Sequence, residues 1–165
     1  MSPVDRSALG KSNRRKGHDA ERDLAKYLRA NGWPQAERAV RAGFRTKDRE
    51  AADPGDITNT PGLVFQSKYV SGMSDAQIAA AMTDAIQQAV AAGADLGILV
   101  ERRSGKADPG LWWAWVSAWD VHQLITGPVP AHPKLVFDVP VRMQVRHLVG
   151  LLHHAGYGNE AEAAA

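Results

Sequence analysis

The amino-acid sequence predicts a mixed α/β domain, with a central β-sheet flanked by α-helices. The chain has 165 residues, which is enough for one domain with a sizeable core. Helical periodicity over residues 15–31 precedes three short strand-like runs, and a second helical pattern over 75–92 precedes further apolar runs. This alternation of helices and short strands is typical of a sheet covered by helices.

Composition and charge limit the classes to which the protein can belong. The chain contains no cysteine, so disulfides and thiolate metal sites are excluded and a reducing cytoplasm is the expected compartment. No apolar run approaches the ~20 residues that span a bilayer, so we expect no membrane association.

Residues 1–50 hold 13 Lys and Arg against 7 Asp and Glu, whereas the whole chain has a net charge of only +2. A polyanion such as nucleic acid would therefore meet the N-terminal third first.

The first half of the chain divides into six expected segments. Residues 1–14 are predicted to be a flexible basic arm, followed by the helix at 15–31, for which Gly32 is a suitable C-terminal cap. A strand at 38–44 leads into a polar loop at 45–55. Strands at 56–58 and 63–70 follow, joined by a turn that contains Asn59, Pro61 and Gly62.

The second half begins with a capping box, Ser74-Asp75-Ala76-Gln77, that opens a helix closed by Gly93. Strands are expected at 96–100, 111–118 and 134–139, a helical turn at 120–125, and a final helix at 141–154. We expect a single domain over 15–156 and a disordered tail at 157–165.

The turn between the strands at 56–58 and 63–70 brings three polar side chains together. Alternation along the second strand puts Gln66 and Lys68 on one face, about 7 Å apart at the backbone. The hairpin places Asp56 near them. An acid, an amide oxygen and a lysine then meet at one edge of the sheet.

This grouping suits metal-assisted hydrolysis of a phosphodiester. Mg²⁺ prefers oxygen ligands and takes one or two carboxylates together with water and substrate phosphate. Asp56, the Gln66 side chain and the Ser67 carbonyl would be the ligands, and Lys68 would polarise the attacking water. On spacing alone, the alternative that Lys68 is a solvated strand lysine and Asp56 a turn acid has about even weight.

Two features of the first predicted helix add to this pattern. Glu21 borders the apolar stripe and lacks a cation four residues on, so it is placed to reach over the edge of the sheet. Arg14, Arg15 and Lys16 oppose the helix dipole, which favours a role toward an external anion.

These residues together resemble the PD-(D/E)xK nuclease superfamily, and within it the Holliday junction resolvases of archaea and phages. The resemblance covers residues 14–70, through RRKGHDAERDLAKYLRANG with Glu21, PGDI with Asp56, and VFQSK with Gln66 and Lys68. It implies a restriction-endonuclease-like fold and Mg²⁺-dependent DNA cleavage, with Mn²⁺ as a substitute, by a homodimer. Glu21, Asp56 and Gln66 would be metal-site residues and Lys68 the catalytic lysine.

The implied function is a structure-selective endonuclease of DNA recombination or repair, in a bacterial or phage-infected cell. The motif departs from the family pattern in two places, since Gly55 separates Pro54 from Asp56 and Gln66 replaces the usual Glu. Some transposase endonuclease subunits resemble the same set of a helical Glu, an Asp and Q-x-K. Two alternatives therefore stay open: a DNA-binding protein with impaired catalysis, and a nuclease subunit that requires a partner protein.

Further basic and aromatic residues have candidate roles. The cations near Asp56 are predicted to contact DNA phosphates; they are Arg38, Arg41, Arg45, Lys47 and Arg49. Alternation in the strand at 111–118 puts Trp113 and Trp115 on one face and Trp112 on the other, which favours core packing over base stacking.

Overall fold

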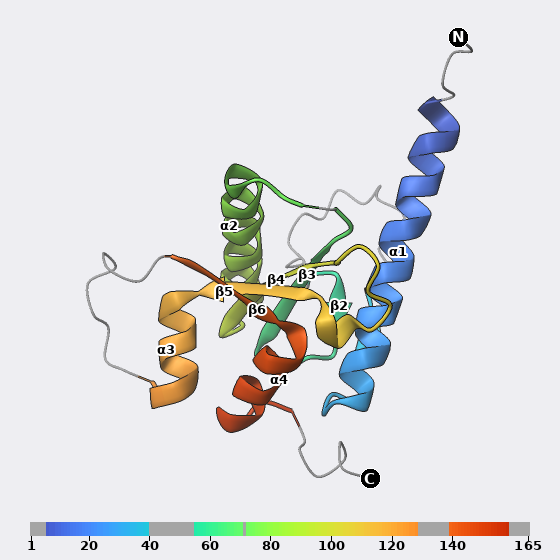
Figure 1. Cartoon of the computed structure of the whole chain (residues 1–165). Helices are drawn as coiled ribbons and strands as arrows, with labels where there is room; N and C mark the ends of the chain where they lie inside the picture. The colour runs from blue at the N-terminus through green and yellow to red at the C-terminus, as the bar shows by residue number, and fades with distance from the viewer. Residues whose placement is uncertain (1–5, 40–54, 71, 129–138, 159–165) are drawn as a thin grey trace.

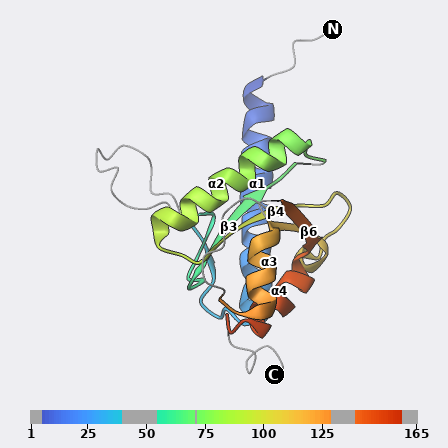
Figure 2. The same cartoon turned by 90° about the vertical axis from the view of Figure 1, so that its left-hand side faces the viewer.

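The computed structural model describes residues 6–39, 55–70, 72–128 and 139–158. Within these ranges six strands form one mixed sheet in the order β1-β2-β3-β4-β5-β6, with helices on both faces (Figure 1, Figure 2). The predicted mixed α/β architecture is therefore confirmed. The strands are β1 (Glu37–Arg38), β2 (Ile57–Thr58), β3 (Leu63–Lys68), β4 (Leu96–Glu101), β5 (Trp113–Ser117) and β6 (Pro140–Gln144).

β3 and β4 run parallel, whereas the other neighbouring strands of the sheet pair antiparallel. A parallel pair needs a long crossover connection, and helix α2 (Asp75–Ala92) supplies it. The carboxyl ends of β3 and β4 consequently lie side by side. The register pairs Lys68 with Glu101 at these ends.

The two faces of the sheet bury separate apolar clusters. On one face, α1 (Arg6–Ala30), α3 (Ala118–Thr126) and α4 (Val145–His154) cover a cluster that includes Leu24, Phe65 and Trp112. On the other face, α2 packs Met82 and its neighbours against Leu99. Trp112 is fully buried, as the core-packing interpretation predicts.

α1 begins at Arg6, nine residues before the predicted start at residue 15. The prediction of an arm over 1–14 is wrong from Arg6 onward. Asn13 to Lys16 are exposed, and the first turns of α1 extend away from the sheet (Figure 1). Asn13 to Lys16 are polar and carry no apolar stripe, which is the pattern that indicates a helix packed on a core.

α2 follows the prediction closely. The Ser74 side chain accepts a hydrogen bond from Gln77 N, the Gln77 side chain bonds the Ser74 backbone, and Gly93 closes the helix with φ of 64°. The helix lies directly on β4. A Cβ atom at Gly97 would come within 2.3 Å of the Ala85 carbonyl oxygen, so the contact requires glycine.

The final predicted helix, 141–154, is wrong over its first four residues. Val141 to Gln144 belong to β6, which pairs with β5, and α4 begins at Val145. Val141, Met143 and Val145 alternate with polar residues, which is the strand period. α3 extends the predicted turn at 120–125, and Ser117 caps it by accepting a hydrogen bond from Asp120 N.

Several expected segments lie outside the described residues. They are residues 1–5 of the arm, most of the strand at 38–44 and of the loop at 45–55, residues 134–138 of the strand predicted at 134–139, and residues 159–165 of the tail predicted at 157–165. Among the described helices, none is both long enough and apolar enough to cross a bilayer.

Candidate functional site at the end of strand β3

Asp56 is held against β3 by both its backbone and its side chain. The Asp56 N–H donates to the Phe65 carbonyl at 2.8 Å, and the Asp56 carboxylate Oδ2 accepts from the Ser67 N–H at 2.8 Å. The Asp56 carbonyl accepts from the Ala39 N–H at 2.9 Å. Asp56 is therefore fixed between the chain that leaves β1 and the end of β3.

Gly55 explains the first departure of the motif. Its φ is +82°, and a Cβ atom at this position would lie 2.7 Å from the Phe65 carbonyl oxygen. Only glycine adopts this conformation without strain and lets the backbone approach β3 so closely. The glycine before Asp56 is a requirement of the hairpin geometry.

Gln66 and Ser67 are the next two residues of the site. Gln66 is 7 % exposed, and its buried Oε1 has no hydrogen-bond partner within the described part of the chain. A buried amide oxygen without a partner costs about 1–3 kcal/mol. Rotation of the Gln66 amide group by a half-turn exchanges the positions of Oε1 and Nε2, so the acceptor oxygen can occupy either position.

Lys68 ends β3 and is half-buried. Alternation puts it on the same face as Gln66, whose register neighbour Leu99 packs under α2. Among the residues that the structure describes, no hydrogen bond or ion pair engages the Lys68 ammonium group. An ammonium group in this state is available to an external anion.

Glu21 contacts Arg38. The Arg38 Nε donates to the Glu21 carboxylate at 2.5 Å, and both side chains are about four-fifths buried. Arg38 lies opposite Ile57 in the β1–β2 register, one residue from Asp56. Through Arg38 the structure connects Glu21 to the β1–β2 edge of the sheet, and its predicted place in a metal site with Asp56 stays a prediction. The structure also pairs two candidate residues, a metal ligand and a DNA contact, with each other.

The remaining predicted DNA contacts fall into two groups. Arg14, Arg15 and Lys16 are exposed on the part of α1 that extends from the sheet. The others, Arg41, Arg45, Lys47 and Arg49, lie outside the described residues.

Glu101 is a buried acid that the sequence analysis missed. It is 6 % exposed, accepts from Trp115 Nε1 at 3.1 Å and lies 3.4 Å from the Met73 N–H. It is the register partner of Lys68 on the same face. Its place in the sequence, at the start of the polar run ERRSGKADPG, indicates a loop and gives no signal of burial.

The donor set around Asp56 fits a weakly held magnesium ion. In the described part of the chain, no three Asp, Glu or His side chains gather into a metal-binding group. Asp56 still has a carboxylate beside the Ser67 N–H, and the Gln66 Oε1 and the Ser67 carbonyl are neutral oxygens on the same stretch of β3 that could serve as ligands. One carboxylate with neutral oxygens matches the sparse protein ligation of Mg²⁺, whose other ligands are water and substrate phosphate.

The chain was compared with protein-family models, with curated proteins and with solved structures, and no match was found in any of the three comparisons.

Proposed function

We propose that the protein is a Mg²⁺-dependent DNA endonuclease, structure-selective in the manner of Holliday junction resolvases. The observation that carries this proposal is the hydrogen bond from the Ser67 N–H to the Asp56 carboxylate. This bond fixes the acid beside β3 between Gln66 and Lys68. The topology, with a helix before a hairpin and a parallel β3–β4 pair, is consistent with a restriction-endonuclease-like fold.

Each residue of the site has a role in phosphodiester hydrolysis. Asp56, Gln66 and the Ser67 carbonyl would hold the metal ion, which supplies Lewis-acid stabilisation of the phosphate oxygens. Lys68 polarises the attacking water and offsets the negative charge that develops on the phosphorane oxygens. Water oxygen bonds to phosphorus, the bond from phosphorus to the leaving oxygen breaks, and the leaving oxygen takes up a proton.

A second function is favoured by a specific observation. The Glu21 carboxylate is paired with Arg38, and Gln66 is neutral, so neither of these two residues brings an unneutralised negative charge to the site. A site with a single carboxylate binds Mg²⁺ weakly. This charge balance favours a DNA-binding protein with impaired cleavage, or a nuclease subunit that a partner protein activates.

DNA, branched or duplex, is the proposed partner in both cases, and we infer a homodimer that nicks two strands symmetrically. A site of this kind belongs to DNA recombination or repair in the cytoplasm of a bacterial or phage-infected cell. The two cases separate on cleavage by the purified protein alone.

The deciding experiment measures cleavage of labelled four-way junction, fork, duplex and single-stranded DNA in Mg²⁺ or Mn²⁺. The matched control is Asp56→Asn, which keeps the shape of the side chain and an acceptor for Ser67 N–H but removes the charge. We expect paired symmetric nicks in the junction with the wild-type protein and none with Asp56→Asn. Tight junction binding without nicks would support the impaired or partner-dependent protein instead.

A further inference from the structure

The row of residues that contains Lys68 continues across the sheet. Strand register pairs Lys68 with Glu101, Glu101 with Trp113, and Trp113 with Gln144, so all four lie in one line on the α2 face. Neighbouring strands are about 4.8 Å apart, so the Trp113 backbone lies roughly 10 Å from that of Lys68. The region beyond residue 101, to which the sequence assigns no role, therefore adjoins the candidate catalytic lysine.

Two arginines lie over the Trp113 ring. The guanidinium carbon of Arg103 is 4.1 Å from the ring centroid, and that of Arg142 is 4.5 Å from it. Arg142 also lies 5.5 Å from the centroid of the Trp115 ring, and Arg103 donates a hydrogen bond to the Leu111 carbonyl at 3.0 Å. Aromatic rings in this arrangement orient the guanidinium groups and lower the entropy that they lose on binding an anion.

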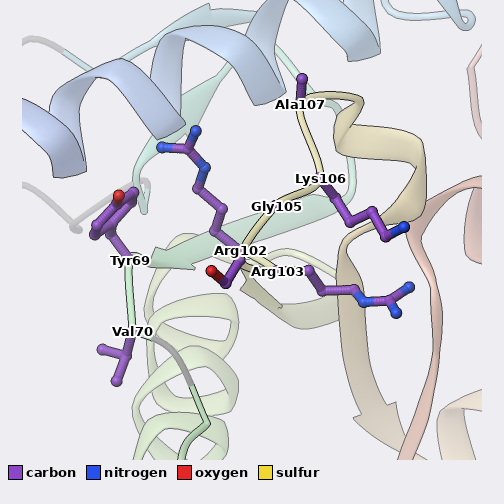
Figure 3. Close-up of a pocket in the computed structure, with 8 residues that line it drawn as sticks. Tyr69, Val70, Arg102, Arg103, Gly105, Lys106 and Ala107 are labelled. Atoms are coloured by element: carbon purple, nitrogen blue, oxygen red, sulfur yellow. The ribbon is translucent and has the colours of Figure 1, made fainter.

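The loop after β4 adds further positive charge. Tyr69, Val70 and residues 102–107 line a pocket of about 400 Å³ beside the end of β3, and no acid is among them. Figure 3 shows Arg102 extending toward Tyr69, and Arg103 and Lys106 extending together on the other side of the loop. The loop is tied to the candidate site, because the Arg102 N–H donates to the Lys68 carbonyl at 3.0 Å.

The acids near these cations are already engaged. Glu101 is buried against Trp115 Nε1, and the Asp108 carboxylate accepts from the Gly110 N–H at 2.8 Å. Lys106 and Arg142 are exposed, and neither makes an ion pair with another described residue. Arginine binds phosphate through two parallel N–H donors, and lysine binds it as a point charge. The oriented guanidinium groups on the Trp113 ring and the unpaired Lys106 beside them suit these two modes.

We propose that Arg103, Lys106 and Arg142, supported by Trp113, bind backbone phosphates of the DNA strand next to the phosphodiester at Lys68. This inference rests on the proposed function and adds a strand-binding surface to it. The guanidinium groups occupy the Trp113 ring, so the surface binds phosphates in preference to stacked bases. Its residues come from the part of the chain for which the family resemblance gives no information.

The test measures DNA affinity as a function of salt concentration in Ca²⁺, which prevents turnover. Each lost phosphate contact lowers the slope of log K against log salt by about 0.9 for duplex and about 0.7 for single strands. We expect Lys106→Ala and Arg142→Ala each to lower the slope by this amount. Lys26→Ala, an exposed lysine on the helix that covers the opposite face, is the matched control and should leave the slope unchanged.

A second pair of variants separates an organised surface from general positive charge. Trp113→Leu removes the ring and leaves the charge intact, whereas Trp113→Phe keeps an aromatic face. We expect about tenfold weaker binding for Trp113→Leu and near wild-type binding for Trp113→Phe. Junctions in which single phosphates are replaced by neutral methylphosphonates then locate the contact. On the junction that lacks the phosphate bound by Arg142, Arg142→Ala should not lower the DNA affinity any further.

The outcomes distinguish this inference from the proposed function. Wild-type binding with slopes unchanged in Lys106→Ala and Arg142→Ala would overturn the strand-binding surface and leave the nuclease proposal standing. Lowered slopes without cleavage by the wild-type protein would support the surface and overturn the nuclease activity. No binding of any DNA by the wild-type protein would overturn both.

Discussion

No described residue pairs with the Lys68 ammonium group, so this group can interact with the negative charge of a substrate phosphate. Lys68→Ala should therefore lower cleavage at least 100-fold while changing DNA affinity less than twofold, since most phosphate contacts lie elsewhere. Single-turnover cleavage and equilibrium binding on the same four-way junction measure the two effects. Lys26→Ala should change neither, and a parallel loss of binding in Lys68→Ala would assign the lysine to substrate binding.

Gln66 is the residue at which the site differs most from the nuclease pattern that the sequence resembles. Gln66→Glu places a second carboxylate beside Asp56. Without metal the two carboxylates repel each other, and with Mg²⁺ the new carboxylate adds a charged ligand. We expect a lower Tm than wild type in EDTA, a larger rise of Tm on addition of Mg²⁺, and equal or higher cleavage. A large loss of cleavage with an unchanged fold would mean that the amide itself has a specific role.

The sequence predicts the central residues of the site because they depend on local geometry. Asp56, Gln66 and Lys68 lie on one hairpin, whose short turn and period of two fix their relative places. The Glu21–Arg38 pair and the burial of Glu101 depend on contacts between distant segments. No spacing rule connects such segments, so the sequence alone places Glu21 near the sheet edge but does not reveal its partner.

His153 connects α4 to the segment that follows α1. It stacks on Trp33 with ring centroids 5.2 Å apart, and its ring nitrogens lie 3.0 Å from the carbonyl oxygens of Asn31 and Tyr157. The ring is half-buried. A histidine next to an apolar helix face gives no sequence signal that identifies such contacts.

His153→Ala should destabilise the protein by about 2 kcal/mol, because the ring stacking is lost and the carbonyl group that accepts from the ring N–H loses its donor. The exposed neighbour provides the control, since His154→Ala should change the free energy of unfolding by no more than about 0.5 kcal/mol. Urea denaturation followed by tryptophan fluorescence compares the two variants. Equal stabilities would show that His153 does not join α4 to α1 in solution.

Element boundaries are predictable where local chemistry sets them. The start and end of α2 follow from a capping box and a glycine in the left-handed conformation. α1 and β6 are predicted less well. Asn13 to Lys16 of α1 are exposed and carry no apolar stripe, and β6 is a strand because it pairs with β5.

At the scale of the whole molecule, Tyr157 connects the C-terminal segment to the loop between α2 and β4. Its hydroxyl donates to the Asp95 carboxylate at 3.0 Å. Burial, followed by this hydrogen bond and the charge of Asp95, raises the pKa of Tyr157 to about 12. The folded state keeps the proton that the unfolded chain loses near pH 10, so this stabilisation is complete below pH 10 and is lost as the pH rises toward 12.

The wild-type Tm should therefore fall between pH 10 and pH 12 more steeply than that of Tyr157→Phe. Differential scanning calorimetry at half-unit pH steps measures both proteins. Tyr27, whose pKa is raised first by burial and then by Asp108, is present in both and cancels in the comparison. Parallel curves would show that the Tyr157–Asp95 contact does not contribute to stability in solution.

The parallel pairing of β3 and β4 also affects how new substrate preferences can arise. Their carboxyl ends meet at one edge, so the segment after Lys68 and the loop from Arg102 to Ala107 leave the sheet side by side. The segment after Lys68 contributes Met73 to the packing under α2, whereas no residue from Arg102 to Ala107 belongs to either buried cluster. The loop after β4 can therefore change in length or charge with less effect on the core than the segment after β3, while the hairpin that holds Asp56 stays constant.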